Sequence, residues 1–379
     1  MNILLNGCVR RPAAELIRAV GLVVFAAALF GALGNPARAQ QPDKVVVGYV
    51  YFSTAGIDYS LYTHICHAFV VADADGGIRR NDHVPSKVLC DAAHASKVRI
   101  LLSLGGWGWD KQFAAIVSKP EAESRYVKSV LAMVDEFDYD GLDLDWEYPD
   151  TKEEMRGFER LVRRLRDGLD AIGKRKERRL ELTMAVSASL KTIRWLRPTF
   201  VNDSFDWLNI MTYDLSGDWT PYAGHNAPLH NSSRQPRGEP LSVERTMRFA
   251  IEQHKIPADK LALGVPLYGQ CFAVAEPYAM KSKDTPRTRL PGGEYRSVHK
   301  LLGGPGWKRV WDDETKVPWL IANDKSAVIG YDDPESVALK ARFAREKSLR
   351  GVFFWEISLD QMPDGSHPLQ KAARAAFLD

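Results

Sequence analysis

Residues 140–147 read Asp-Gly-Leu-Asp-Leu-Asp-Trp-Glu, a run in which acidic and apolar residues alternate. Side chains of a β-strand point alternately to its two faces. Asp143, Asp145 and Glu147 therefore share one face, about 6–7 Å apart along the strand. A strand at the surface would expose these acids to water. A strand of a closed parallel barrel would turn the apolar residues towards the surrounding helices and the acids inward, and we expect this second arrangement.

Three carboxylates on one face make chemical sense as a group that shares protons. Like charges at this spacing raise the pKa of at least one member. A glutamic acid that stays protonated near neutral pH can act as a general acid. A calcium loop would need oxygen ligands at alternate positions and a glycine at the sixth. The intervening Leu142, Leu144 and Trp146 argue against such a loop, and a solvated acidic strand remains the other alternative.

The chain on both sides of this run alternates short β-branched or aromatic stretches with amphipathic ones. We expect strands at Val45–Tyr51, His64–Val71, Val98–Ser103, Gly141–Trp146, Glu181–Ser187, Trp207–Thr212, Leu261–Pro266 and Gly351–Trp355. Amphipathic helices are expected at Arg125–Phe137, Lys152–Ile172, Val243–Lys255 and Pro334–Lys347. Alternating strands and helices indicate parallel βα units. Eight such units predict an α/β fold, a (β/α)8 TIM barrel.

One interval departs from this alternation. About 60 residues, roughly 270–329, separate the seventh and eighth expected strands. This stretch carries several aromatic residues and turn signals such as Pro291-Gly292-Gly293, and it is too long for a structureless loop in a compact domain. We expect a small α+β insertion there.

The N-terminal segment has the pattern of a secretory signal. Arg10, Arg11 and Arg18 precede an apolar run over residues 19–33, and Ala37 and Ala39 supply small residues before a cleavage site. We expect residues 1–39 to be removed after about Ala39, which leaves an extracellular or periplasmic protein. An uncleaved membrane anchor is the alternative, although the apolar run is short for a spanning helix.

Charge and cysteine usage limit the possible partners. The chain has 51 basic and 48 acidic residues, and loss of residues 1–39 would leave 47 of each. A neutral chain lacks the basic surface that nucleic-acid binding needs. Cys66 and Cys90 could form a disulfide after export or remain buried thiols. No cysteine or histidine spacing indicates a metal, so we expect neither a metal nor another cofactor.

Four acids at fixed spacing carry a family resemblance. Asp140, Asp143, Asp145 and Glu147 resemble the DxxDxDxE signature of glycoside hydrolase family 18. Further segments resemble that family in the same order along the chain: Ser103–Gly106, Met211–Asp214, Gly264–Gly269 and Gly351–Glu356. The insertion after the seventh strand resembles that of the family's chitinase-like members. The resemblance implies that residues 40–379 form one catalytic unit.

The resemblance also implies a mechanism and roles for the acids. Glu147 would act as acid and base on β-1,4-linked N-acetylglucosamine polymers or oligomers, and the substrate's acetamido oxygen would replace a protein nucleophile. Asp145 would hold the acetamido N–H, Asp143 would share a proton with Asp145, and Tyr213 would bind the acetamido oxygen. Asp140 and the motif glycines Gly105 and Gly106 would be structural.

Substrate contacts are implied for a further set of residues: Asp214, Met211, Trp355, Trp107, Trp219, Tyr268, Tyr49 and Phe69. For Trp107 and Trp219 the alternative is packing within a loop, and for Tyr49 and Phe69 it is the barrel core. Gln270 stands where family members often carry arginine, which puts contacts to Asp214 in doubt. The other functions considered are an endo-β-N-acetylglucosaminidase, a lipo-chito-oligosaccharide hydrolase and a lectin. A monomer with no nucleic-acid or membrane partner is expected.

Overall fold

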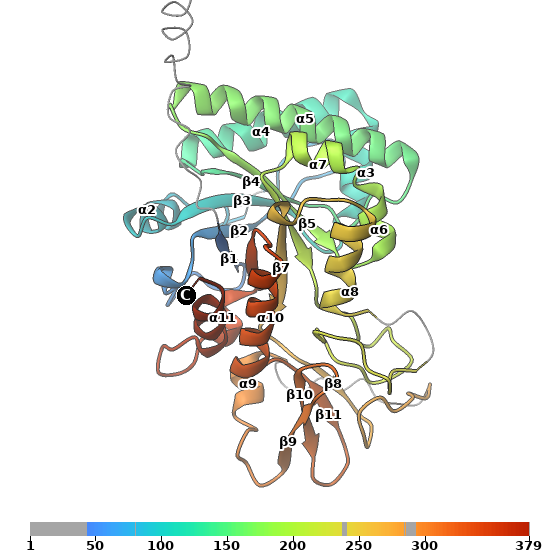
Figure 1. The fold of residues 1–379 in the computed structure, drawn as a ribbon. Helices are drawn as coiled ribbons and strands as arrows, with labels where there is room; N and C mark the ends of the chain where they lie inside the picture. The colour runs from blue at the N-terminus through green and yellow to red at the C-terminus, as the bar shows by residue number, and fades with distance from the viewer. Residues whose placement is uncertain (1–43, 80, 237–240, 284, 286–292, 379) are drawn as a thin grey trace, which may run out of the picture. The chain divides into compact units, whose positions relative to one another are not determined.

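A computed structural model of the chain describes residues 44–79, 81–236, 241–283, 285 and 293–378. Eight parallel strands of this part close into a barrel with helices around it (Figure 1). Around the barrel the order is β1, β12, β7, β6, β5, β4, β3, β2. The strands are β1 (Val45–Val50), β2 (His64–Val70), β3 (Arg99–Gly105), β4 (Gly141–Asp145), β5 (Glu181–Ser187), β6 (Trp207–Met211), β7 (Leu261–Pro266) and β12 (Gly351–Trp355). The expected TIM barrel is confirmed.

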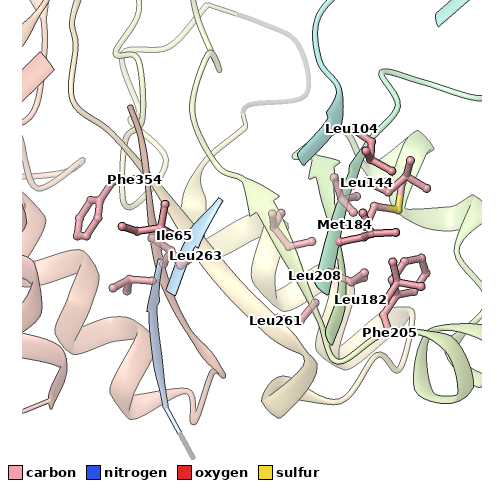
Figure 2. Packing of buried hydrophobic residues seen from close by; sticks show 14 of the residues in the cluster. Ile65, Leu104, Leu144, Leu182, Met184, Phe205, Leu208, Leu261, Leu263 and Phe354 are labelled. Carbon is pink, nitrogen blue, oxygen red and sulfur yellow. The ribbon is translucent and has the colours of Figure 1, made fainter. Parts of the chain in front are cut away.

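Strand β4 shows why the alternating run folds as it does. Leu142 and Leu144 are fully buried in the main apolar core, which lies between the strands and the surrounding helices. Figure 2 shows Leu144 in this layer beside Leu104 and Met184 of the neighbouring strands. Burying a leucine side chain contributes about 1.5–3 kcal/mol. Because successive side chains alternate, that burial turns the acids of β4 into the barrel.

The helices cover the outside of the barrel. They are α2 (Lys87–Ala95), α3 (Asp110–Ser118), α4 (Pro120–Phe137), α5 (Lys152–Arg175), α6 (Leu190–Trp195), α7 (Pro198–Ser204), α8 (Val243–Arg248), α10 (Pro334–Glu346) and α11 (Pro368–Leu378). Helix α5 begins with a capping box, in which the Thr151 side chain accepts from the Glu154 amide and the Glu154 carboxylate accepts from the Thr151 amide. The single helix expected at residues 243–255 is instead α8 followed by a π-helical turn at Phe249–Gln253.

The interval between β7 and β12 folds as the expected insertion. It holds α9 (Tyr295–His299) and a four-stranded antiparallel sheet in the order β8, β11, β10, β9. These strands are β8 (Gln270–Phe272), β9 (Trp307–Asp312), β10 (Val317–Ala322) and β11 (Val328–Gly330). Figure 1 shows the insertion on the side of the barrel away from α4 and α5. A separate apolar cluster that includes Phe272 and Trp319 holds it together.

The two cysteines considered for a disulfide lie on opposite faces of the barrel wall. Cys66 belongs to the cluster inside the barrel, whereas Cys90 belongs to the layer between strands and helices. They are not bonded to each other, and both are buried free thiols. Residues 1–39, where we expect the signal peptide, lie outside the described part of the chain. Within that part, no helix is long and apolar enough to cross a membrane.

Candidate active site

A cleft of about 890 Å³ opens where the barrel strands end. The C-terminal end of the strands is where TIM barrels build their active sites. Twelve of the residues expected from sequence to form the site line this cleft: Tyr49, Phe69, Gly105, Gly106, Trp107, Asp145, Glu147, Met211, Tyr213, Asp214, Trp219 and Trp355. The fold therefore gathers residues from six different barrel strands and the segments that follow them.

Three of the expected residues do not line the cleft. Asp143 is fully buried beneath it. Tyr268 lies behind Tyr213, with ring centroids 6.3 Å apart. Asp140, before β4 begins, accepts hydrogen bonds from His94 Nε2 at 2.8 Å and from the Ile100 amide at 2.9 Å. These contacts tie β4 to α2 and β3 at the start of the strand, consistent with the structural role expected for Asp140.

Asp143 lies in a cage of hydrogen-bond donors. Its Oδ2 accepts from the hydroxyls of Tyr49 at 2.8 Å and Ser103 at 2.7 Å. Its Oδ1 accepts from the Thr183 hydroxyl at 2.6 Å and, at 3.4 Å, from the Asn209 amide. Burial raises the pKa of Asp143, and these four donors oppose the rise. The cage fixes the carboxyl group below Asp145, with both oxygens satisfied.

Asp145 has the opposite environment. Its side chain is 3% exposed, and its Oδ1 has no hydrogen-bond partner among the described residues. Burial raises the pKa of Asp145 well above its ordinary value, and the neighbouring Glu147 and Asp143 raise it further. Without donors to stabilise its anion, Asp145 is the carboxyl group of this strand that is best suited to keep a proton.

Glu147 follows β4 and borders the open cleft. Burial raises its pKa; a hydrogen bond from Tyr148 lowers it, and the charge of Asp214 raises it. The Tyr148 hydroxyl donates to Glu147 Oε2 at 2.9 Å. A carboxyl group whose pKa is raised and which borders an open cleft is suited to give a proton and to take one back.

Two glycines allow β3 to end close against β4. Gly105 has φ +104°, and a Cβ there would lie 2.3 Å from the backbone oxygen of Asp145. Gly106 has φ +93°, and a Cβ would lie 2.7 Å from the Phe69 ring. The Gly106 amide donates to the Asp145 carbonyl at 2.9 Å. Larger residues at either position would displace Asp145 or Phe69.

Asp214 is held from the insertion as well as from the barrel. It has φ 55°, and its amide donates to Asn226 Oδ1 at 2.8 Å. Gln270 Nε2 donates to Asp214 Oδ1 at 2.9 Å. Burial raises the pKa of Asp214, and hydrogen bonds from Tyr268 and Gln270 partly offset this rise. The sequence left a contact between Gln270 and Asp214 in doubt. The structure has this contact, and its donor is the neutral amide of Gln270.

Aromatic side chains form much of the rest of the cleft. Trp355 stacks with Phe69 at 5.7 Å and with Tyr51 at 5.8 Å between ring centroids. Trp107 and Trp219 are 81% and 63% exposed, so most of each side chain is open, although the edge of the Trp219 ring lies against Gly217 of its own loop. Flat apolar faces of this kind suit the C–H faces of sugar rings.

Several residues of the site were missed from sequence. Ser103 and Thr183 pair in register with Asp143 from the strands on either side, and their inward direction was readable from strand alternation. Their partnership with Asp143 depends on the register, which the sequence does not state. Tyr148 lies after the strand ends, so the alternation gave no signal for it.

Comparisons with known proteins agree with this geometry. A family model described as glycosyl hydrolases family 18 matches residues 44–360. Chitinase A1 of Niallia circulans is 29% identical over 288 residues, covering 70% of this chain and 41% of that protein. Endochitinase 1 of Metarhizium robertsii is 29% identical over 273 residues, covering 70% and 63%. The matches thus span less than two thirds of the length of either relative.

A solved structure extends the likeness over the whole barrel. A family 18 N-acetylglucosaminidase from Paenibacillus barengoltzii superposes with a TM-score of 0.78 at 26% identity, covering 88% of this chain and 99% of that one. The fold is a TIM barrel that carries acidic side chains where its strands end. The family model covers well over half of the chain, and the chain belongs to glycosyl hydrolase family 18.

Proposed function

We propose that the protein hydrolyses β-1,4 bonds of chitin or chito-oligosaccharides with net retention, and that Glu147 is its acid and base. The observation that carries this proposal is the contrast between Glu147 and Asp145. Glu147 borders the cleft with a raised pKa, while burial holds the pKa of the adjacent Asp145 well above its ordinary value. A carboxyl group that keeps its proton cannot serve as an anionic nucleophile.

We infer that the substrate itself supplies the nucleophile. Glu147 donates its proton to the glycosidic oxygen as the bond to the anomeric carbon breaks. The acetamido carbonyl oxygen of the same sugar attacks that carbon and forms an oxazolinium ion. Water then attacks the anomeric carbon as the bond from that carbon to the acetamido oxygen breaks, and the water gives a proton to Glu147, which restores the acid. Two inversions at one carbon give retention, as in the substrate-assisted exceptions to the two-carboxylate scheme.

The other residues hold the acetamido group during these steps. Asp145, with Oδ1 free of partners among the described residues, accepts the acetamido N–H, and the neighbouring Asp143 favours the protonated form of Asp145. Tyr213, which also lines the cleft, donates to the acetamido oxygen. Trp355 supplies the floor on which the reacting sugar stacks. These roles require an N-acetylated sugar at the cleavage site.

A linear chain is the substrate that fits the cleft best. Aromatic residues with exposed faces follow β1, β3 and β6, where Tyr51, Trp107 and Trp219 line the opening. Several sugars of one chain could each meet such a face. The names of the relatives as chitinases support the same substrate class. The protein acts as a monomeric unit of residues 40–379, exported after removal of residues 1–39.

The test compares purified protein on polymeric chitin, N-acetylated tri- to hexasaccharides and a high-mannose glycopeptide. We expect cleavage of the first two, with the β-anomer as the first product seen by NMR. Glu147→Gln should lose about 10²–10⁴-fold in kcat, whereas Glu346→Gln, an exposed acid at the end of α10, should retain full activity. Full activity of Glu147→Gln, or cleavage beside a sugar without an N-acetyl group, would refute the mechanism.

The export proposal has its own test. Expression of the full chain should release a protein whose intact mass corresponds to cleavage after about Ala39. A protein that retains residues 1–39 in the membrane fraction would favour the anchor alternative.

A further inference from the structure

A chain of hydrogen bonds reaches Glu147 from β5. The Ser189 amide donates to Ser187 Oγ at 3.1 Å. Ser187 acts on the Tyr148 hydroxyl as a donor that lowers its pKa, and the Tyr148 hydroxyl donates to Glu147 Oε2 at 2.9 Å. All four residues line the cleft. Of these four residues, only Glu147 has a role in the mechanism proposed above.

The direction of the chain follows from its last member, because the ionised Glu147 carboxylate can only accept and so takes the one proton of Tyr148. A backbone amide can only donate, and each hydroxyl has one proton to give. Ser187 accepts from the Ser189 amide and gives its own proton to Tyr148, an arrangement that favours the tyrosine anion and so lowers the pKa of Tyr148 against the effect of burial. Tyr148 is then left with its proton for Glu147 Oε2. Such aligned donors strengthen one another.

The consequence concerns which oxygen of Glu147 carries the exchangeable proton. Oε2 already accepts from Tyr148, so a proton placed there would compete with that hydrogen bond. We infer that Tyr148 is a positioning residue, directed by Ser187, which fixes Glu147 Oε2 as an acceptor and assigns the catalytic proton to Oε1. This inference rests on the proposed function.

The same hydrogen bond matters for the second half of the reaction. Glu147 must be ionised when it takes a proton from water. The charged or titratable groups around it are Asp145 on β4, Asp214 after β6, and the hydroxyls of Tyr213 and Tyr148. No lysine, arginine or histidine is among the described residues that line the cleft. Of the groups that act on Glu147, Tyr148 is the one that stabilises its anion.

The test is the pH dependence of kcat and kcat/KM on an N-acetylated tetrasaccharide for wild type, Tyr148→Phe and Ser187→Ala. Without its donor the Glu147 anion is less stable, so its pKa rises and the alkaline limb of kcat/KM moves to higher pH. Because the hydrogen bond also orients the carboxyl group, maximal kcat should fall about tenfold. Ser187→Ala leaves the Tyr148 contact in place, and we expect a smaller shift in the same direction.

Controls separate this effect from general damage. Tyr59→Phe removes a hydroxyl outside the cleft and should leave the profile unchanged. Each variant is first shown to unfold at the wild-type temperature, and Ser187→Ala serves alone if Tyr148→Phe does not fold. If the wild type is active and both variants keep its alkaline limb of kcat/KM, the inference is wrong, even if kcat falls. Inactivity of the wild type on every N-acetylated substrate overturns the proposed function instead.

Discussion

Gln270 Nε2 donates to Asp214 Oδ1 at 2.9 Å, and this bond joins the first strand of the insertion to the residues that follow β6. Tyr268 also hydrogen-bonds the Asp214 carboxylate. The insertion therefore contributes to the position of an acid that faces the cleft. Because the donor is an amide, it orients Asp214 without adding a positive charge beside Glu147.

Substitution of Gln270 should weaken substrate binding more than it slows the reaction. Gln270→Leu removes one of the two donors to Asp214, and a hydrogen bond to a charged group contributes about 1.5–3 kcal/mol. We expect KM for a tetrasaccharide to rise about tenfold with a smaller change in kcat. Gln270→Glu, which adds a repelling charge at the same size, should raise KM further. Equal KM values for wild type and Gln270→Glu would show that Gln270 does not position Asp214.

The acids of β4 should make stability depend on pH in a predictable direction. The folded protein holds the proton of Asp145 more tightly than the unfolded chain, because burial and the neighbouring acids raise its pKa. Stability from this group is therefore lost as pH rises above about 4, the ordinary range for aspartate. Asp145→Asn cannot ionise, so it should unfold at a higher temperature than wild type near pH 7, and the difference should vanish near pH 4.

Asp140 provides a matched control with the opposite sign. Burial raises its pKa, but hydrogen bonds from His94 and the Ile100 amide, with the charges of Arg99 and Arg178, bring it below its ordinary value. Stability from Asp140 is present above about pH 4 and is lost as pH falls. Asp140→Asn should therefore be less stable than wild type at pH 7. Thermal unfolding across pH 3–8 measures both variants, and shifts of the same sign would contradict the assignment.

Trp107 should affect binding of long substrates and leave stability unchanged. Its side chain is 81% exposed, and substitutions at such sites change stability by about 0.5 kcal/mol or less. Pairs of aromatic rings contribute about 0.5–1.5 kcal/mol beyond their buried area. With a similar gain for an aromatic ring on a sugar face, Trp107→Ala should raise KM for a hexasaccharide up to about tenfold. Val88→Ala, an equally exposed apolar residue on α2, is the control. No change in KM for the hexasaccharide would exclude Trp107 as a platform.

A buried ion pair should hold the end of the insertion to α10. Lys340 Nζ lies 2.6 Å from both carboxylate oxygens of Asp332, and both side chains are buried. Lys340→Met would leave a buried carboxylate without its charge partner, which costs about 3–5 kcal/mol. Urea unfolding should show this loss, and addition of Asp332→Asn should recover part of it. If Lys340→Met alone is as stable as wild type, the ion pair contributes little to stability.

Periodicity in the sequence was sufficient to predict the barrel, because each strand carries its own apolar signal. The expected strands at Glu181–Ser187, Leu261–Pro266 and Gly351–Trp355 coincide with β5, β7 and β12. Helix α8 was less predictable. Its apolar spacing suits one continuous helix and carries no signal for the π-helical turn that begins at Phe249.

The sequence by itself determined that Asp143 and Asp145 lie on one face of β4, since alternation is a local property of extended backbone. Glu147, two residues further on, lies just beyond the end of the strand. Only the tertiary structure decided how differently the three behave. Asp143 receives donors from strands that pair beside it, Asp145 lacks a donor for Oδ1 among the described residues, and Glu147 receives one from Tyr148. Burial and hydrogen-bond partners set a carboxyl group's pKa, and both come from residues distant in sequence or beyond the strand.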